Sequence, residues 1–198
     1  MLYRFFVFTL AGLLLSACSH QARSPLDSPA QGDAGAIEQW ALNGKLGIAA
    51  QDPRGKSLRQ SANINWQQDR EGYSIHLSGP LGQGSTQIKS DSGGVTLKQA
   101  GQADIHAASA NELLLNTLGY TLPLDALYYW ARGIPSPVAP PELEQRSVSG
   151  DLSQLKQLGW QLDYSPFQDV MHWQLPRKII ASKGSTRITL IIKKWRLP

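Results

Sequence analysis

The sequence is poor in the residues on which most catalytic and metal sites depend. It contains one cysteine, Cys18, so the chain cannot form an internal disulfide. The four histidines, His20, His76, His106 and His172, are isolated and have no metal-ligand spacing. A G-x-S-x-G nucleophile motif is also missing. We therefore predict no enzyme activity, no catalytic residue and no metal site.

One stretch imitates a nucleotide-binding loop without completing it. Residues 79–86 copy the spacing of a P-loop, but Ser85 stands where the phosphate-binding lysine is needed. The residues that follow, Thr86–Lys89, have the pattern of a strand. Because no helix N-terminus would then face a phosphate, nucleotide binding is not predicted.

Long runs of charge are scarce as well. The formal net charge is +4, and the only basic cluster is Lys193–Arg196. No basic stripe carries interleaved aromatic residues, so nucleic acid is not a predicted partner. A mild positive balance suits an anionic membrane surface, although ordinary solvation is the better explanation at this stage.

The N-terminus has the layout of an export signal. Arg4 precedes an apolar run, Phe5–Leu15, which is too short to span a bilayer permanently. The run ends in Leu15-Ser16-Ala17-Cys18, which resembles the bacterial lipobox. This resemblance implies cleavage before Cys18, a diacylglycerol on its sulfur and an N-acyl group such as palmitate, with no other cofactor. An ordinary signal peptide with a chance cysteine is the alternative.

The rest of the chain divides into a tether and one domain. Residues 19–35 contain Pro25, Pro29, Gly32 and Gly35 and no apolar period, which is typical of a flexible linker. We predict a signal peptide at 1–17, a lipidated tether at 18–35 and a single domain at 36–198. Ser19 follows the cysteine where enteric lipoproteins retained at the inner membrane carry Asp. By that resemblance the protein is anchored in the outer membrane and faces the periplasm.

Alternation with a period of two indicates strands with one buried face. It occurs at 42–50, 58–67, 73–77 and 95–97, and again at 160–164, 171–175, 179–181 and 187–197. Two helices interrupt the strands. The first follows a capping box at Ser109 and Glu112, and the second runs from Pro123 to Gly133, with Leu124, Leu127, Tyr128 and Ala131 on one face. We therefore predict a mainly β (α+β) fold, a curved antiparallel sheet with inserted helices. Patterning alone does not decide whether its interior is filled or hollow.

Several of these motifs together resemble the LolB family of outer-membrane lipoprotein receptors. They are the lipobox, the Gly79-Pro80-Leu81-Gly82 turn, the helix ending at Leu118-Gly119, and the run from Pro123-Leu124 through Trp130-Ala131-Arg132-Gly133-Ile134-Pro135. The resemblance implies an incomplete antiparallel barrel of about 11 strands with a helical lid over an apolar cavity. The family's longer N-terminal helix has room here only for a turn at Ala36–Trp40.

The resemblance also implies a function. Such a receptor accepts lipoproteins from a LolA-like periplasmic carrier and releases them into outer-membrane phospholipid without ATP. Leu81, between Pro80 and Gly82, matches the family's protruding leucine for membrane insertion. On sequence alone, a Leu81 side chain folded back onto the core is the simpler reading. We predict that the acyl cavity is lined by Trp66, Leu115, Leu118, Leu127 and Trp173, and that the protein is a monomer.

Two other functions fit the same sequence. An outer-membrane lipoprotein can act as a scaffold for an envelope complex, in which case it would copurify with a partner. A lipid-modifying enzyme would instead turn over substrate and lose activity on a single polar substitution.

Overall fold

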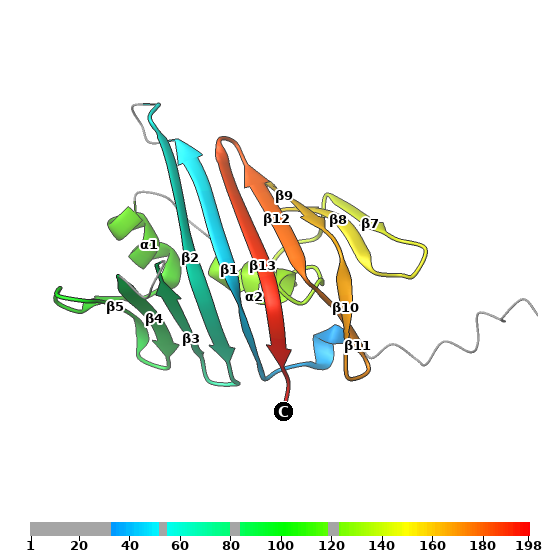
Figure 1. Cartoon of the computed structure of the whole chain (residues 1–198), viewed down its shortest axis with the longest axis horizontal. Helices are drawn as coiled ribbons and strands as arrows, with labels where there is room; N and C mark the ends of the chain where they lie inside the picture. Colours follow the sequence, from blue (N-terminus) through cyan, green and yellow to red (C-terminus); the bar gives the residue numbers. More distant parts are fainter. Residues whose placement is uncertain (1–32, 52–54, 80–83, 119–122) are drawn as a thin grey trace, which may run out of the picture.

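The computed structural model describes residues 33–51, 55–79, 84–118 and 123–198. The signal peptide, Cys18 and the Pro80–Gly82 turn lie outside the described residues. The fold is dominated by one eleven-stranded antiparallel sheet, ordered β6-β5-β4-β3-β2-β1-β13-β12-β9-β8-β7, beside a two-stranded sheet of β10 and β11. The two outermost strands, β6 and β7, do not pair with each other, so the sheet stays open (Figure 1). The fold thus confirms the predicted curved antiparallel sheet.

The strands of the large sheet are β1 (Trp40–Gln51), β2 (Ser57–Gln68), β3 (Tyr73–Ser78), β4 (Ser85–Asp91), β5 (Gly94–Gln99), β6 (Ile105–Ala107), β7 (Leu143–Arg146), β8 (Leu152–Gln157), β9 (Trp160–Tyr164), β12 (Lys178–Lys183) and β13 (Thr186–Arg196). The small sheet pairs β10 (Phe167–Val170) with β11 (Trp173–Pro176). The helices are α1 (Ala110–Leu118) and α2 (Leu124–Trp130).

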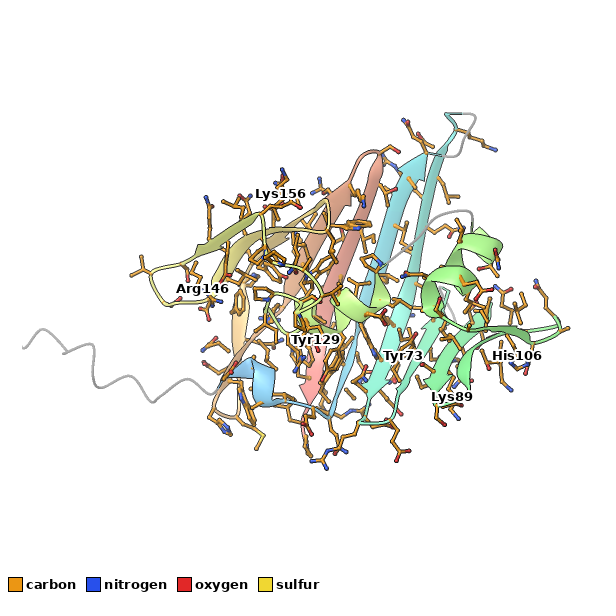
Figure 2. The ribbon with its side chains drawn as sticks, turned by 180° about the vertical axis from the view of Figure 1, so that it is seen from behind. Tyr73, Lys89, His106, Tyr129, Arg146 and Lys156 are labelled. Carbon is orange, nitrogen blue, oxygen red and sulfur yellow. The ribbon has the colours of Figure 1, made fainter. Side chains whose placement is uncertain are left out.

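Alternation places one set of side chains on the inner face of the sheet. Leu42 pairs with Trp66 of β2 and with Trp195 of β13, and all three are buried. The pattern continues outward through Ile75, Ile88 and Leu97. Both helices lie over this face, as the view from behind shows (Figure 2). The opposite face, seen in Figure 1, has no described helix over it.

A β-bulge fixes the pairing of β1 with β13. The register shifts between Asn43 and Gly44, and a Cβ atom at Gly44 would lie 2.0 Å from the carbonyl oxygen of Ile191. Only glycine allows this close approach of the two backbones.

The predicted helix starts are largely confirmed. The Ser109 hydroxyl accepts a hydrogen bond from the Glu112 amide at 3.2 Å, and the Glu112 carboxylate accepts one from the Ala108 amide at 3.1 Å. This is a capping box in which the glutamate accepts from Ala108 rather than from the amide of the N-cap residue, Ser109. Helix α2 ends before Gly133, which has φ +78.

The N-terminal turn lies earlier than predicted. Residues Ala34–Ala36 form a 3₁₀ turn, and Trp40 already begins β1. The Asp33 carboxylate accepts a hydrogen bond from the Gly35 amide at 2.8 Å and so caps the turn. Ala34 and Gly35, predicted as the end of the tether, therefore have regular structure.

Buried tyrosines give the fold a pH dependence. The hydroxyl of Tyr164 is buried and has no hydrogen-bond partner among the described residues, and burial raises its pKa. In the unfolded chain this tyrosine ionises near pH 10, whereas in the folded protein it stays protonated to higher pH. The free energy of unfolding is therefore independent of this group below pH 10 and decreases as the pH rises above 10.

We expect Tyr164→Phe to raise the free energy of unfolding by about 1 kcal/mol at neutral pH, because it removes an unpaired buried hydroxyl. The advantage over wild type should grow above pH 10. Urea unfolding at neutral and alkaline pH measures both effects, with Tyr129→Phe, at a half-buried residue, as the control. A destabilised Tyr164→Phe protein would show that the hydroxyl has a partner.

Candidate functional site

An apolar cavity of about 400 Å³ lies on the inner face of β1–β3. Its apolar lining comes from Leu46 and Ile48 of β1, Ala62 of β2 and Leu77 of β3. The registers pair Leu46 with Ala62, and Ile64 with Leu77, so these side chains point to the same face. These four apolar residues are only half-buried, and Leu58 further along β2 is 38% exposed. Gln60, Ser61 and Thr86 also line the cavity and give it a polar part. This part of the inner face is apolar but incompletely covered.

The two described residues that flank the predicted membrane-insertion turn belong to the lining of this cavity. Gly79 and Gly84 both line it, and they flank residues 80–83. Pro80, Leu81 and Gly82 themselves lie outside the described residues.

An aromatic cluster fills the inner face at the other end of β1 and β2. Trp40 lies 4.9 Å from Trp66, 5.4 Å from Trp195 and 6.0 Å from Tyr128, between ring centroids. The indole N–H groups of Trp40 and Trp66 are buried and have no acceptor among the described residues. Leaving such a donor unpaired costs about 1–3 kcal/mol. The described surroundings of the two indole N–H groups are therefore apolar.

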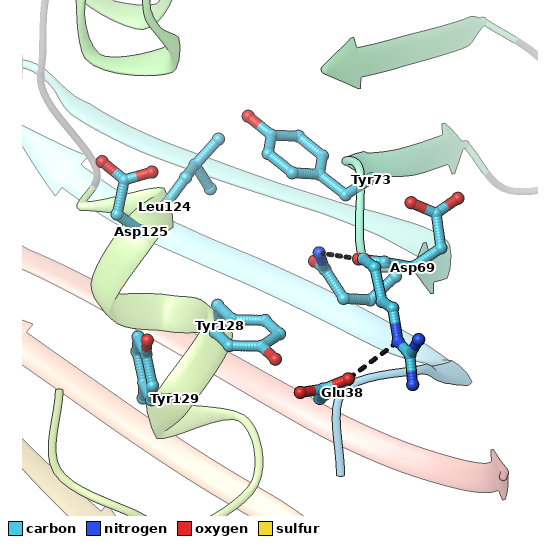
Figure 3. Close-up of a pocket in the computed structure, with 9 residues that line it drawn as sticks. Glu38, Asp69, Tyr73, Leu124, Asp125, Tyr128 and Tyr129 are labelled. Carbon is cyan, nitrogen blue, oxygen red and sulfur yellow. Dashed lines mark hydrogen bonds and ion pairs between the residues drawn. The ribbon is translucent and has the colours of Figure 1, made fainter. Parts of the chain in front are cut away.

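A second cavity of about 500 Å³ lies between α2 and the β2–β3 turn (Figure 3). Its walls carry acidic, amide and phenol groups, from Glu38, Gln68, Asp69, Arg70, Tyr73, Leu124, Asp125, Tyr128 and Tyr129. Glu38 pairs with Arg70 at 2.8 Å. Burial raises the pKa of Tyr73 to about 12, and the Asp125 carboxylate adds to the rise. These polar walls suit hydrated groups better than acyl chains.

Two buried polar side chains hold α2 in place. The guanidinium of Arg132 donates to the carbonyl oxygens of Ala34 at 3.0 Å and of Ile37, and lies 4.1 Å from the Tyr128 ring centroid. Burial lowers the pKa of Arg132. Gln157 of β8 accepts hydrogen bonds from the Trp130 indole at 2.7 Å and from the Ser136 amide at 2.9 Å. The helix is therefore tied both to the N-terminal turn and to the sheet.

The predicted cavity residues with described side chains differ in their surroundings. Trp66 is buried in the aromatic cluster, and Leu127 packs half-buried against the core. Leu115 is 52% exposed on α1, and Trp173 lies half-buried in the small sheet. The side chain of Leu118 lies outside the described part of the chain. None of the four with described side chains lines either of the two cavities described above.

The apolar residues that do line the 400 Å³ cavity had a sequence signal. Leu46, Ile48 and Leu77 all sit on the inward side of the predicted strands. Alternation predicts which face of the sheet these residues occupy. It does not predict that this part of the face is exposed, because the helices that cover the rest of the face come from elsewhere in the chain.

Within the described ranges no group of three or more His, Cys, Asp or Glu residues is arranged to hold a metal ion. No helix among the same residues has the length and apolar character needed to cross a membrane. An open antiparallel sheet with helices on its inner face and an apolar surface left partly uncovered defines a half-barrel protein.

The family profile described as "Outer membrane lipoprotein LolB" matches residues 38–195. An outer-membrane lipoprotein LolB of Cellvibrio japonicus is 40% identical over 196 residues, covering 96% of this chain and 94% of its own. The protein of the same name from Chromohalobacter salexigens is 35% identical, covering 93% and 86%. The chain therefore belongs to the LolB family of outer-membrane lipoproteins, which act in lipoprotein localisation and are not enzymes.

Among solved structures, a LolA superfamily protein, NE2245 from Nitrosomonas europaea, superposes with a TM-score of 0.48 and 9% identity. The superposition covers 82% of this chain and 87% of that chain. A similarity at this level carries no inference about function.

Proposed function

We propose that this protein accepts lipoproteins from a LolA-like periplasmic carrier and inserts them into the inner leaflet of the outer membrane. The observation that carries the proposal is the half-covered apolar surface around Leu46, Ile48 and Leu77. Binding of acyl chains to an apolar surface of this kind is favourable, since burying each methylene contributes about 0.8 kcal/mol. Family membership supports the same role.

Transfer of this kind needs no nucleotide. An acylated lipoprotein cannot cross water unaided, so it has to pass from one apolar surface to another. If this surface holds acyl chains more tightly than the carrier does, and the bilayer holds them more tightly still, the transfer runs downhill. The protein itself stays at the membrane through the diacylglycerol and N-acyl groups that we propose on Cys18. One acyl chain anchors weakly, whereas several anchor stably.

We propose that the Pro80-Leu81-Gly82 turn contacts the bilayer during insertion of the lipoprotein. The flanking residues Gly79 and Gly84 line the apolar cavity, which supports this proposal. A leucine at such a place that enters the bilayer contributes roughly 1.5–3 kcal/mol. That is enough for a transient contact and too little for an anchor.

We expect Leu81→Glu to keep the uptake of lipoprotein from the carrier and to lose its delivery to the membrane. A form without the lipid anchor, carrying Cys18→Ser, is mixed with carrier that holds radiolabelled lipoprotein, without ATP. Gel filtration should show that the label reaches wild type and Leu81→Glu equally, whereas delivery to liposomes should be lost in the variant.

Gln83→Glu adds the same charge to the same turn and serves as the matched control, because it removes no apolar group. It should deliver as wild type does. Delivery by Leu81→Glu at the wild-type rate would refute the role of the turn. Failure of the label to reach wild type at all would refute the receptor proposal.

A further inference from the structure

The four central strands of the sheet carry basic residues and no acidic residue at all. Strands β2, β1, β13 and β12 contain no Asp or Glu. Their registers bring six exposed cations to the outer face, which we call the basic face. Its members are Lys45, Arg59, Lys178, Arg187, Lys194 and Arg196.

The pairing shows how residues distant in sequence come together on the basic face. One row across the strands runs Lys45, Ile191, Lys178, and another runs Arg59, Ala49, Arg187. Since neighbouring strands lie about 4.8 Å apart, Lys45 and Lys178 stand roughly 10 Å apart, slightly more than the Debye length of about 8 Å at physiological salt. The cations therefore repel one another weakly at physiological salt and more strongly at low salt.

No acid of the described chain compensates this repulsion. None of the six cations forms an ion pair with a described residue, whereas Arg70, Lys89, Lys98, Arg146 and Lys156 each pair with a carboxylate elsewhere on the molecule. The nearest acid in the sheet is Asp163 of β9, opposite Ile180, and it accepts a hydrogen bond from Gln154. The basic face is an unneutralised positive surface on a chain of near-balanced charge.

We propose that the basic face docks on the anionic phospholipid headgroups of the membrane to which the chain is anchored. Charge complementarity supports this occupant, because clustered Lys and Arg are drawn to anionic leaflets. The composition of the face also disfavours a protein partner, whose interface needs an apolar centre rich in aromatic residues. Ile191, 42% exposed, is the one large exposed aliphatic side chain among the described residues of these four strands on this face.

The tether reaches far enough for this contact. Residues 19–32 separate Cys18 from the first described residue, and a chain of that length spans up to about 50 Å when extended. Its average span is nearer 20 Å, so the tether holds the folded body close to the headgroups. A weak, salt-sensitive contact then suffices to orient the body.

Docking by this face would turn the inner face, with its apolar cavity, away from the bilayer and toward the periplasm. That is the orientation in which a carrier can be met. It rests on the anchor and on the charges rather than on the transfer reaction, so the two proposals fail separately. Delivery through the turn at Leu81 then requires the body to roll over, which a weak contact permits.

The test uses the mature chain with Cys18→Ser and vesicles of phosphatidylcholine with or without phosphatidylglycerol, without carrier or cargo. Wild type should cosediment with the anionic vesicles only, and less at higher salt. The triple variant Lys45→Gln, Lys178→Gln, Arg187→Gln should bind them more weakly by on the order of tenfold to a hundredfold. Thermal unfolding checks that it remains folded.

The control triple Lys89→Gln, Lys98→Gln, Lys156→Gln removes the same charge from cations that have acidic partners. It should keep most of the binding. If both triple variants lost vesicle binding equally, the binding would depend only on net charge, and the proposal would be overturned. Wild-type binding that does not depend on phosphatidylglycerol would also overturn it, and would leave an acidic carrier protein as the better candidate for this face.

Discussion

Leu46→Asp is expected to abolish uptake of acylated cargo while leaving the protein folded. Leu46 lies half-buried in the 400 Å³ cavity, where a carboxylate meets solvent in the empty state but would be covered by a bound acyl chain. Covering an unpaired charge with hydrocarbon costs several kcal/mol, which cancels the gain from burying several methylenes. Transfer of labelled lipoprotein from the carrier should fall by at least about tenfold.

Leu77→Asp, on the neighbouring part of the same cavity, provides a second test with the same expected loss. The matched control is Ile191→Asp, which places the same carboxylate on the opposite face of the sheet. It should accept cargo at the wild-type rate. Circular dichroism and thermal unfolding identify any variant that fails to fold. Normal uptake by both folded cavity variants would show that acyl chains bind elsewhere.

Arg132→Met should produce the largest loss of stability, about 3 kcal/mol in the free energy of unfolding. The side chain is 1% exposed, and its guanidinium is the group that joins the Ala34–Ala36 turn to α2. Methionine keeps the apolar stem but removes the hydrogen bonds to the carbonyls and the contact with the Tyr128 ring. A hydrogen bond to a charged group contributes about 1.5–3 kcal/mol and a cation–π contact about 0.5–2 kcal/mol.

Urea unfolding followed by tryptophan fluorescence measures this change. Hydrogen exchange at the amides of Ala36 and Ile37, which close the turn, should accelerate locally even below the unfolding transition. Arg70→Met is the control, since that side chain is 73% exposed in its ion pair with Glu38 and should contribute about 0.5 kcal/mol or less. An unchanged Arg132→Met protein would mean that the turn and the helix hold together without this link.

The sequence predicted the strands whose two faces differ in polarity. Buried and less buried residues alternate over Trp40–Gly44 of β1 and Ile64–Trp66 of β2, because one face packs on the core and the other meets solvent. Strand β8 was missed. Its inward positions include Gln157, which is fully buried and bonded to Ser136, Ala139 and Trp130. A buried polar residue breaks the apolar pattern, and only the fold shows that its partners are present.

The packing of α2 was predicted only in part. The interpretation placed Leu124, Leu127, Tyr128 and Ala131 on the buried face, and Leu124 and Ala131 are indeed buried. Leu127 and Tyr128 are half-buried, however, while Ala126 is also buried. A helix of seven residues that packs on several sides has no single apolar stripe, so its period does not fix its orientation.

The two surfaces proposed as functional depend on pairing between distant segments. The cavity residues lie on the same face of the sheet as the core residues. They differ from the core residues only in that no other element covers them fully. The basic face joins residues more than a hundred positions apart, such as Lys45 and Lys178, and so has no local sequence signature. The lipobox and the Pro80-Leu81-Gly82 turn, by contrast, are continuous motifs that the sequence alone identifies.

The most direct test of the account is to find where a cargo acyl chain binds. Lipoprotein carrying a photoreactive acyl chain would be passed from the carrier to the Cys18→Ser protein without ATP, crosslinked by light and mapped by mass spectrometry. The account predicts adducts on the inner face of β1–β3, at Leu46, Ile48 or Leu77. Adducts confined to the outer face or to the polar cavity beside Tyr73 would contradict it.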